Sequence, residues 1–178
     1  MTTETSNDLA WRQLLAPYKK ANWGKALWQV INSAIPFALL WWAMATTVNT
    51  RPWLSLLLAI PTAFFFIRLF ILQHDCGHFS FFPSRTANNL LGAALGVVTL
   101  FPYGYWRRTH AIHHATNGNL DEREFGDVRT LTVREFEART PLGKFLYRLY
   151  RNPFVLFVVG PFYQFVLKHR FPFDIPFS

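Results

Sequence analysis

Two long apolar blocks joined by a short polar connector dominate the pattern of this chain. Residues 26–48 carry no charged side chain, and residues 53–72 are interrupted only by Arg68 near their end. As helices these blocks would be roughly 34 Å and 30 Å long, enough to cross the apolar core of a bilayer. The connector, Asn49-Thr50-Arg51-Pro52, is rich in turn formers. The pattern therefore predicts a tight transmembrane hairpin over residues 26–72, with the Arg68 side chain reaching the lipid headgroups.

The segments on either side of the hairpin complete the picture of an all-α integral membrane protein. Residues 1–25 mix aromatic, apolar and basic side chains and are expected to form a cytoplasmic segment that lies along the membrane surface. Residues 73–152 contain one further apolar stretch, 88–101, which is too short for a comfortable crossing and suits a re-entrant or interfacial element. Residues 153–178 are interpreted as the start of a further membrane segment.

Local signals mark a loop and two helix starts in the polar region. The segment 115–127 contains the turn signal Asn117-Gly118-Asn119 and is expected to be an exposed loop. Thr132 followed by Glu135 matches a capping box, and the pair Thr140-Pro141 matches an N-cap with proline at the first helical position. Two short amphipathic helices are therefore predicted to begin at these sites.

The positions of the charged residues carry more information than the net charge of +8. Basic residues precede the first apolar block and follow the second, whereas the connector carries only Arg51. By the positive-inside rule, this asymmetry places the N-terminus and the region after the hairpin on the cytoplasmic side. The same distribution argues against nucleic-acid binding, because the charge follows the expected membrane topology.

A mostly polar segment precedes the first block, so that block is not interpreted as a signal peptide.

Five of the six histidines fall in two short groups after the hairpin, His74-Asp75-Cys76-Gly77-His78 and His110-Ala111-Ile112-His113-His114. A helix turns about 100° per residue, so histidines four apart stand one turn apart on the same face. His74 and His78 can therefore converge on one metal ion. Neutral imidazole suits iron, zinc, copper and nickel, and a set without cysteine pairs argues against structural zinc. The predicted metal ligands are His74, His78, His110, His113 and His114.

Polar residues near the histidines are candidates for supporting roles, each with a plainer alternative. Asp75 can accept a ring proton of a ligand histidine and fix its tautomer, or it can be an ordinary carboxylate on a helix surface. Asn117 and Asp121 are further candidates of this kind, although a plain turn explains them equally well. Arg107 and Arg108 can contact a lipid phosphate or a carrier-linked substrate, or they can simply orient the protein in the membrane.

The remaining chemistry-bearing residues favour structural roles. Cys76 is the only cysteine, so the chain forms no internal disulfide, which is consistent with a reducing compartment. It lies about 100° around a helix from His74 and is expected to be a small buried thiol. The aromatic clusters at residues 64–66 and 81–82 can line a tunnel for an apolar ligand, but lipid-facing packing is the expected use.

Around its histidine groups the chain resembles the integral-membrane fatty acid desaturases, in particular acyl-lipid desaturases of the omega-6 type. The run His74-Asp75-Cys76-Gly77-His78-Phe79-Ser80 resembles the first histidine box of that family. Residues 106–117, Trp-Arg-Arg-Thr-His-Ala-Ile-His-His-Ala-Thr-Asn, resemble its second box. The family's order of hairpin, first box, short apolar element and second box extends over about residues 26 to 120.

The resemblance implies a di-iron enzyme that introduces a double bond into an acyl chain. It implies two non-haem iron ions, for which the five histidines are an incomplete ligand set, O2 as co-substrate, and a membrane lipid or carrier-linked fatty acid as substrate. The implied electron donor is ferredoxin or cytochrome b5. The chemistry is consistent with the residues, because an unactivated methylene C–H bond is beyond acid–base side chains and requires a metal-bound oxidant.

The chain departs from that family in one respect. Members carry a third box of the His-x-x-His-His type near the C-terminal end, whereas His169, the sixth histidine, stands alone. The chain is therefore expected to correspond to the N-terminal part of a desaturase and to be inactive by itself. A related di-iron hydroxylase or ketolase and an inactive truncated membrane remnant are the alternatives. An intramembrane zinc protease is disfavoured, because Asp75 stands where His-Glu-x-x-His has its glutamate.

Overall fold

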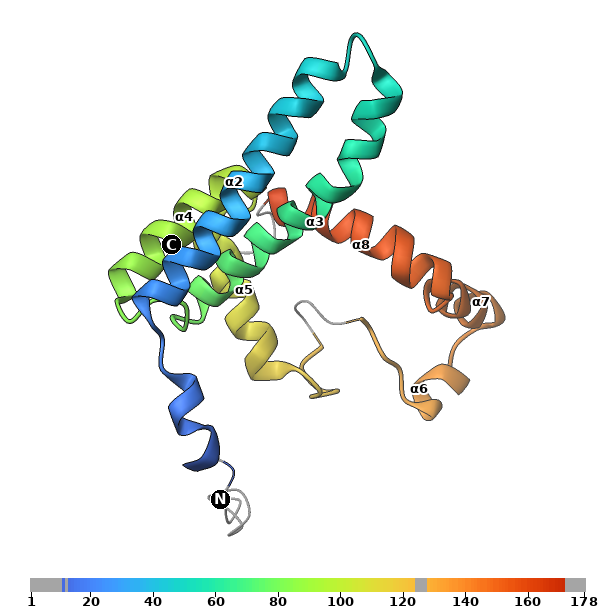
Figure 1. Cartoon of the computed structure of the whole chain (residues 1–178). Coiled ribbons are helices and arrows are strands. Elements are labelled where there is room, and N and C mark those ends of the chain that lie inside the picture. The colour runs from blue at the N-terminus through green and yellow to red at the C-terminus, as the bar shows by residue number, and fades with distance from the viewer. Residues whose placement is uncertain (1–10, 12, 124–127, 172–178) are drawn as a thin grey trace. The chain divides into compact units, whose positions relative to one another are not determined.

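A computed structural model describes residues 11, 13–123 and 128–171, and every regular element in these residues is helical (Figure 1). This agrees with the all-α class expected from the sequence. Residues 1–10, 12, 124–127 and 172–178 lie outside the described residues, as does the side chain of His169, and with them parts of the predicted N-terminal, loop and C-terminal segments. The chain divides into two units, Met1–Thr99 and Leu100–Ser178.

The first unit is built on a hairpin of two long helices, α2 (Trp23–Thr47) and α3 (Pro52–Gly77). They run side by side in opposite directions (Figure 1), after a short 3-10 turn, η1 (Ala16–Lys19). Both are long and apolar enough to cross a membrane, in agreement with the expected hairpin. Helix α3 continues without a break past the apolar block and ends after the first histidine group has begun.

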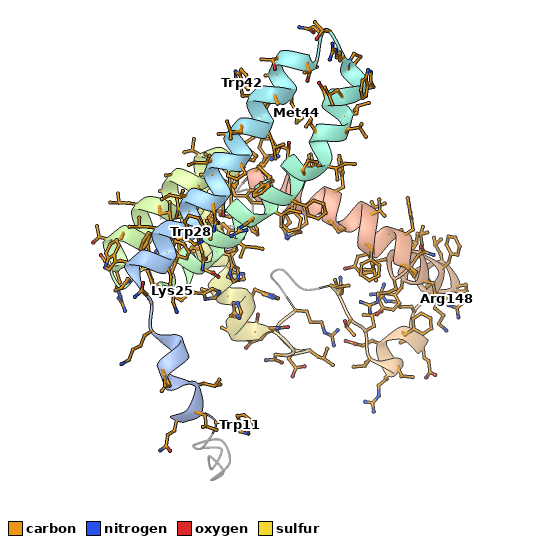
Figure 2. The ribbon with its side chains drawn as sticks, in the orientation of Figure 1. Trp11, Lys25, Trp28, Trp42, Met44 and Arg148 are labelled. Carbon is orange, nitrogen blue, oxygen red and sulfur yellow. The ribbon has the colours of Figure 1, made fainter. Side chains whose placement is uncertain are left out.

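Small and polar side chains lie between α2 and α3, while large apolar side chains face outward. Ser55 is buried, and the Thr62 hydroxyl donates to the Met44 sulfur at 3.2 Å. Trp28 and Trp42 project away from the helix pair and are 64% and 67% exposed (Figure 2). Polar contacts inside and apolar surface outside are typical of helices that pack together in lipid. The hairpin therefore has the side-chain distribution of a membrane-embedded element.

Arg68 carries the one charge in the second apolar block. In the structure its Nη2 donates to the Asn32 Oδ1 of the neighbouring helix at 2.6 Å. Charged side chains within apolar helices are usually paired with a polar group. The sequence pattern predicts that the Arg68 guanidinium reaches the lipid headgroups. In the structure the Asn32 amide is its hydrogen-bond partner.

The third apolar stretch forms helix α4 (Arg85–Thr99), which packs against α3. Its close approach uses two buried glycines, Gly92 and Gly96, in the small-xxx-small pattern. The Thr99 hydroxyl donates to Gln73 Oε1 at 2.7 Å, and both side chains are fully buried. At 15 residues the helix is about 22 Å long, shorter than the apolar core of a bilayer.

A buried asparagine holds the turn between α3 and α4. The Asn88 side chain accepts a hydrogen bond from the Phe82 N–H at 3.0 Å and donates to the carbonyls of Phe82 and Ser84, both at 2.8 Å. The Phe82 ring also contacts Trp23 at the start of α2, with ring centroids 4.7 Å apart. Phe81 and Phe82 are therefore buried in the protein. The expectation that they face lipid was wrong.

In its described residues, 100–123 and 128–171, the second unit contains three helices and a final apolar helical run. The helices are α5 (Tyr103–Thr116), α6 (Val133–Glu137) and α7 (Pro141–Tyr150). The apolar run consists of η2 (Val155–Val159), α8 (Gly160–Phe162) and η3 (Tyr163–Leu167), followed by the turn η4 (Lys168–Arg170). With Val155–Leu167 as its extent, this run is shorter than a membrane span.

Both predicted helix starts are confirmed. At α6 the Glu135 N–H donates to the Thr132 hydroxyl at 3.2 Å, and the Thr132 N–H donates to Glu135 Oε2 at 2.6 Å, which completes a capping box. At α7 the Thr140 hydroxyl accepts from the Gly143 N–H at 3.2 Å, with Pro141 at the first helical position. Local sequence thus determines where these helices begin.

The capping box at α6 makes local stability depend on pH. The Arg123 guanidinium, which donates to Glu135 at 2.9 Å, and the hydrogen bonds from Thr132 lower the pKa of Glu135 from 4.5 to about 2. Because the folded pKa lies below the ordinary value, this stabilisation is complete above pH 4.5 and is lost as the pH falls toward 2. We expect the amide of Thr132 to lose hydrogen-exchange protection over that window, after correction for intrinsic exchange.

A Glu135→Gln variant serves as the control, because its side chain does not titrate. Its Thr132 amide should be less protected at neutral pH and should show no loss between pH 4.5 and 2. Wild-type protection that stays constant down to pH 2 contradicts the assigned role of the carboxylate.

Candidate metal centre

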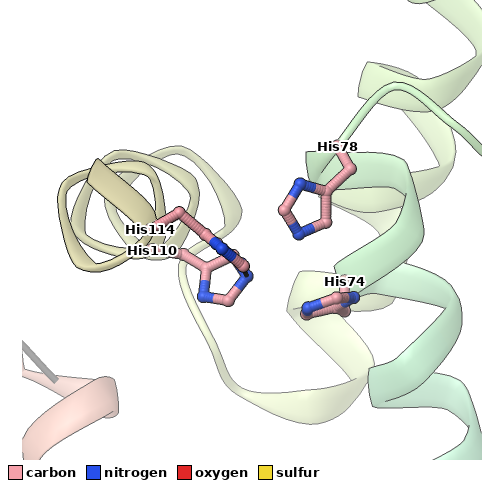
Figure 3. A group of neighbouring side chains, drawn as sticks. All are labelled: His74, His78, His110 and His114. Atoms are coloured by element: carbon pink, nitrogen blue, oxygen red, sulfur yellow. Dashed lines mark hydrogen bonds between the residues drawn. The ribbon is translucent and has the colours of Figure 1, made fainter. Parts of the chain in front are cut away.

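The first histidine pair lies at the end of α3. His74 is in the last turn of the helix and His78 is its C-cap residue, with ring centroids 4.6 Å apart on the same side (Figure 3). His74 Nδ1 lies 3.1 Å from Asp75 Oδ1. A carboxylate only accepts hydrogen bonds, so in a neutral imidazole this contact favours the tautomer with the proton on Nδ1.

The backbone beneath His78 is fixed by a Schellman motif. The Phe79 N–H donates to the Cys76 carbonyl at 3.0 Å, and the Ser80 N–H donates to the Asp75 carbonyl at 3.1 Å. Phe79 occupies the left-handed region, with φ of 55°, a position that helices usually give to glycine. A side chain there costs roughly 1 kcal/mol, which the two hydrogen bonds offset. The helix end that carries His78 is therefore well defined.

The second histidine pair lies on α5. The Nε2 atoms of His110 and His114 are 3.0 Å apart, and the ring planes are nearly perpendicular at 88° (Figure 3). One turn earlier, the Trp106 indole stacks on His110 with ring centroids 4.5 Å apart and an interplanar angle of 17°. Trp106 is only 3% exposed. The stack restricts rotation of the His110 ring and so favours one direction for its Nε2 atom.

The donor groups within each pair are of the kind that a transition-metal ion prefers. Each of the four paired histidines offers one ring nitrogen as a ligand atom. The His110 and His114 Nε2 atoms, 3.0 Å apart in hydrogen-bonding contact, are close enough together to bind one ion. Imidazole nitrogen with an adjacent carboxylate is a ligand environment that iron accepts.

The other predicted site residues on α5 lie on neighbouring stripes of the helix. The His113 ring centroid is 6.1 Å from that of His110 and 5.8 Å from that of His114. As neighbours in the sequence, His113 and His114 lie on different stripes of the helix. Arg107 is half-buried, and Arg108 is exposed. Their contact with lipid or substrate stays a prediction.

Asn117 and Asp121 lie in the exposed turn that follows α5. The Asn117 N–H donates to the His113 carbonyl at 2.7 Å and closes the helix. Gly118 follows with φ of 82°, a conformation that favours glycine. The Asp121 N–H donates to Asn119 Oδ1 at 3.0 Å, which forms an Asx turn. The geometry of both residues is that of a turn, and a role near metal stays a prediction.

Three supporting contacts are not predicted from the sequence. Trp106 stacks on a histidine, Asn88 holds the turn after the first histidine group, and Gln73, next to His74, accepts from Thr99. The available signals are the four-residue spacing of Trp106 and His110 and the amide of Gln73 at the end of an apolar block. Cys76, expected to be a buried thiol, is 0% exposed, which confirms that expectation.

Comparison with known proteins adds independent evidence. A family model described as fatty acid desaturase matches residues 51–177. The chain is 43% identical to a fatty acid desaturase of Bacillus subtilis over 88% of its own length and 45% of the relative's. It is 48% identical to an sn-1 acyl-lipid omega-3 desaturase (ferredoxin) of Synechocystis over 33% of its length and 16% of the relative's. An sn-1 oleoyl-lipid 12-desaturase of Anabaena variabilis is 34% identical over 55% of the chain and 27% of that protein.

No solved structure matches the chain. The chain spans less than half the length of each of these curated relatives. The family model nevertheless covers most of its residues, including both histidine groups. The two apolar helices and these matches indicate a membrane protein. This chain belongs to the fatty acid desaturase family.

Proposed function

We propose that this chain contributes to an O2-dependent desaturase that introduces a double bond into the acyl chain of a membrane lipid or carrier-linked fatty acid. The observation that carries the proposal is the presence of two histidine pairs at one-turn spacing, one closing α3 and one on α5, within the residues that match the family. The reaction converts two neighbouring methylene groups, O2, two electrons and two protons into a double bond and two water molecules.

The proposed ligands of two non-haem iron ions are His74, His78, His110, His113 and His114. Bound iron would supply the activation of O2 that side chains alone cannot provide. The chain's own residues orient these ligands. Asp75 accepts the Nδ1 proton of His74 and fixes its tautomer, while the Trp106 stack orients His110.

The proposed orientation places the N-terminus and both histidine groups on the cytoplasmic side. Three basic residues precede α2, Lys25 lies in its first turn and many more follow α3, but the turn between these helices carries only Arg51. In this orientation the end of α3 brings His74 and His78 to the inner lipid leaflet, where an acyl chain can reach them. Arg107 and Arg108 are placed for contact with a lipid phosphate.

The proposed electron donor is a small redox protein on the same side of the membrane. Ferredoxin is named for the Synechocystis relative, and cytochrome b5 is the alternative implied by the family resemblance. The reaction needs two electrons from outside the chain for each double bond.

Asn117 and Asp121, in the exposed turn after α5, are proposed as residues that support the ligands.

A chimera tests this function. We expect the matched segment of the Bacillus subtilis desaturase, replaced by this chain, to yield an enzyme that forms unsaturated acyl chains in the host membrane. Gas chromatography of fatty acid methyl esters detects the product. The same chimera with His110→Ala and His114→Ala should form none.

Other products separate the proposal from its alternatives. Hydroxylated or keto fatty acids in place of alkenes would assign a hydroxylase or ketolase activity. A chimera that folds in the membrane, binds no iron and forms no product would identify the chain as a remnant, and the proposal would then fail.

A further inference from the structure

Helix α7 exposes a continuous apolar stripe. Four large side chains at helical spacing form it, each at least half exposed: Leu142 (65%), Phe145 (61%), Leu146 (52%) and Leu149 (50%). At about 100° per residue these positions fall within an arc of roughly 100° on one face. An arc of this width is what a helix usually buries against protein or lipid.

The polar face of α7 is the one that contacts protein. Tyr147 Oη accepts from the Leu131 N–H and Tyr150 Oη accepts from the Arg129 N–H, both at 3.0 Å. A water-soluble amphipathic helix has the opposite arrangement, with its apolar face packed and its polar face in water. The stripe on α7 is therefore directed toward a non-aqueous environment.

Basic side chains on the same polar face pack over an aromatic ring. Lys144 Nζ and Arg148 Cζ lie 5.9 Å and 5.6 Å from the centroid of the Phe136 ring. Figure 2 shows Arg148 on this helix. These contacts hold the basic groups close to α7, on the side away from its apolar stripe. The helix thus separates apolar and cationic groups as a surface-bound membrane helix does.

We propose that α7 is an anchor that lies in the bilayer interface, with its apolar stripe among acyl chains and its basic residues at anionic headgroups. Charge supports this occupant. Residues 128–152 contain six basic residues and two carboxylates, so the segment is strongly cationic. A lipid surface with phosphate headgroups complements that charge, whereas a second copy of the same cationic segment would repel it. This anchoring role goes beyond the proposed desaturation and does not depend on it.

The next helical run supports lipid as the occupant. Phe154 and Phe157, which directly follow α7 and its short connection, are 65% and 79% exposed. Large exposed aromatic side chains therefore follow the stripe along the sequence. Exposed apolar side chains beside basic residues are typical of a membrane interaction site.

Depth-dependent fluorescence tests the proposal on the full chain. A bimane label is attached at Leu146→Cys in a Cys76→Ser background, and the protein is placed in nanodiscs with brominated-acyl or nitroxide-acyl lipids. Lys144→Cys, on the opposite face of the same helix, is the matched control. We expect the Leu146 label to be quenched by these lipids at least about twofold more than the Lys144 label, because an interfacial helix inserts its apolar face about 5–10 Å. Iodide should show the reverse preference.

Each possible result supports or overturns the anchor. Leu142→Cys repeats the measurement at a second stripe position, and circular dichroism verifies the helical content of every variant. A Leu146 label that iodide quenches freely places the stripe in water and overturns the proposal. A label that neither lipid nor iodide quenches is covered by protein, either a second copy or another part of the chain, and also overturns it. If the lipids quench the Leu146 label equally in nanodiscs with and without phosphatidylglycerol, the proposed contact of the basic residues with anionic headgroups is wrong.

Discussion

Replacement of both His110 and His114 by alanine is expected to lower the affinity of the chain for ferrous iron by more than about 100-fold. The reason is the loss of two nitrogen ligands, since loss of a single group that merely supports a ligand costs about 10- to 100-fold. The two Nε2 atoms are 3.0 Å apart and therefore suit adjacent positions on one ion. Competition with a calibrated chelator, with iron measured by mass spectrometry, gives the affinity of the detergent-solubilised chain.

Two further variants make this result specific. Asp75→Asn keeps every proposed ligand but weakens the contact with His74 Nδ1, so a smaller loss, of about 10- to 100-fold, is expected. Thr109→Ala, on the same helix, removes a hydroxyl that bonds only to its own helix backbone in the structure, and iron affinity should not change. If the double histidine variant binds iron as tightly as the wild type, the α5 pair is not part of the metal site.

Asn88→Ala is expected to destabilise the first unit by about 2–4 kcal/mol. The substitution removes three hydrogen bonds and leaves a buried N–H of Phe82 and the carbonyls of Phe82 and Ser84 without these partners. Asn88 is 0% exposed, so water does not readily replace the lost amide. The loss of helical circular dichroism with temperature or denaturing detergent measures this effect.

Thr86→Ala is the matched control on the same helix, because Thr86 is exposed. Its unfolding should differ little from that of the wild type. A midpoint for Asn88→Ala equal to that of Thr86→Ala would show that the turn after α3 does not depend on the asparagine. If His74 and His78 bind iron as proposed, the affinity is expected to fall in Asn88→Ala, because this turn follows directly after the two proposed ligands.

Features encoded by neighbouring residues were predictable from the sequence. The hairpin follows from two apolar blocks with a turn-forming connector, and the starts of α6 and α7 follow from Thr132 with Glu135 and from Thr140 with Pro141. The histidine pairs follow from helical spacing alone. Each of these signals lies within a few residues of the structure that it determines.

Features that depend on contacts between distant residues were not predictable. The hydrogen bond of Arg68 joins α3 to Asn32 on α2, and Phe82 is buried because Trp23 lies beside it. Composition alone gives such aromatic residues a lipid-facing role. The left-handed conformation of Phe79 was also missed, because the expected signal for that position is glycine.

Helix α3 contains Pro61 but continues without a further proline from there to the first histidine pair, so this part of the helix moves as one unit. A tilt that adjusts the block to a thicker or thinner lipid layer displaces the imidazoles of His74 and His78 by the same rotation. Insertion of a single residue after Arg68 would swing both rings by about 100° and raise them by about 1.5 Å. The thickness of the surrounding bilayer thereby affects the direction in which these two imidazoles point.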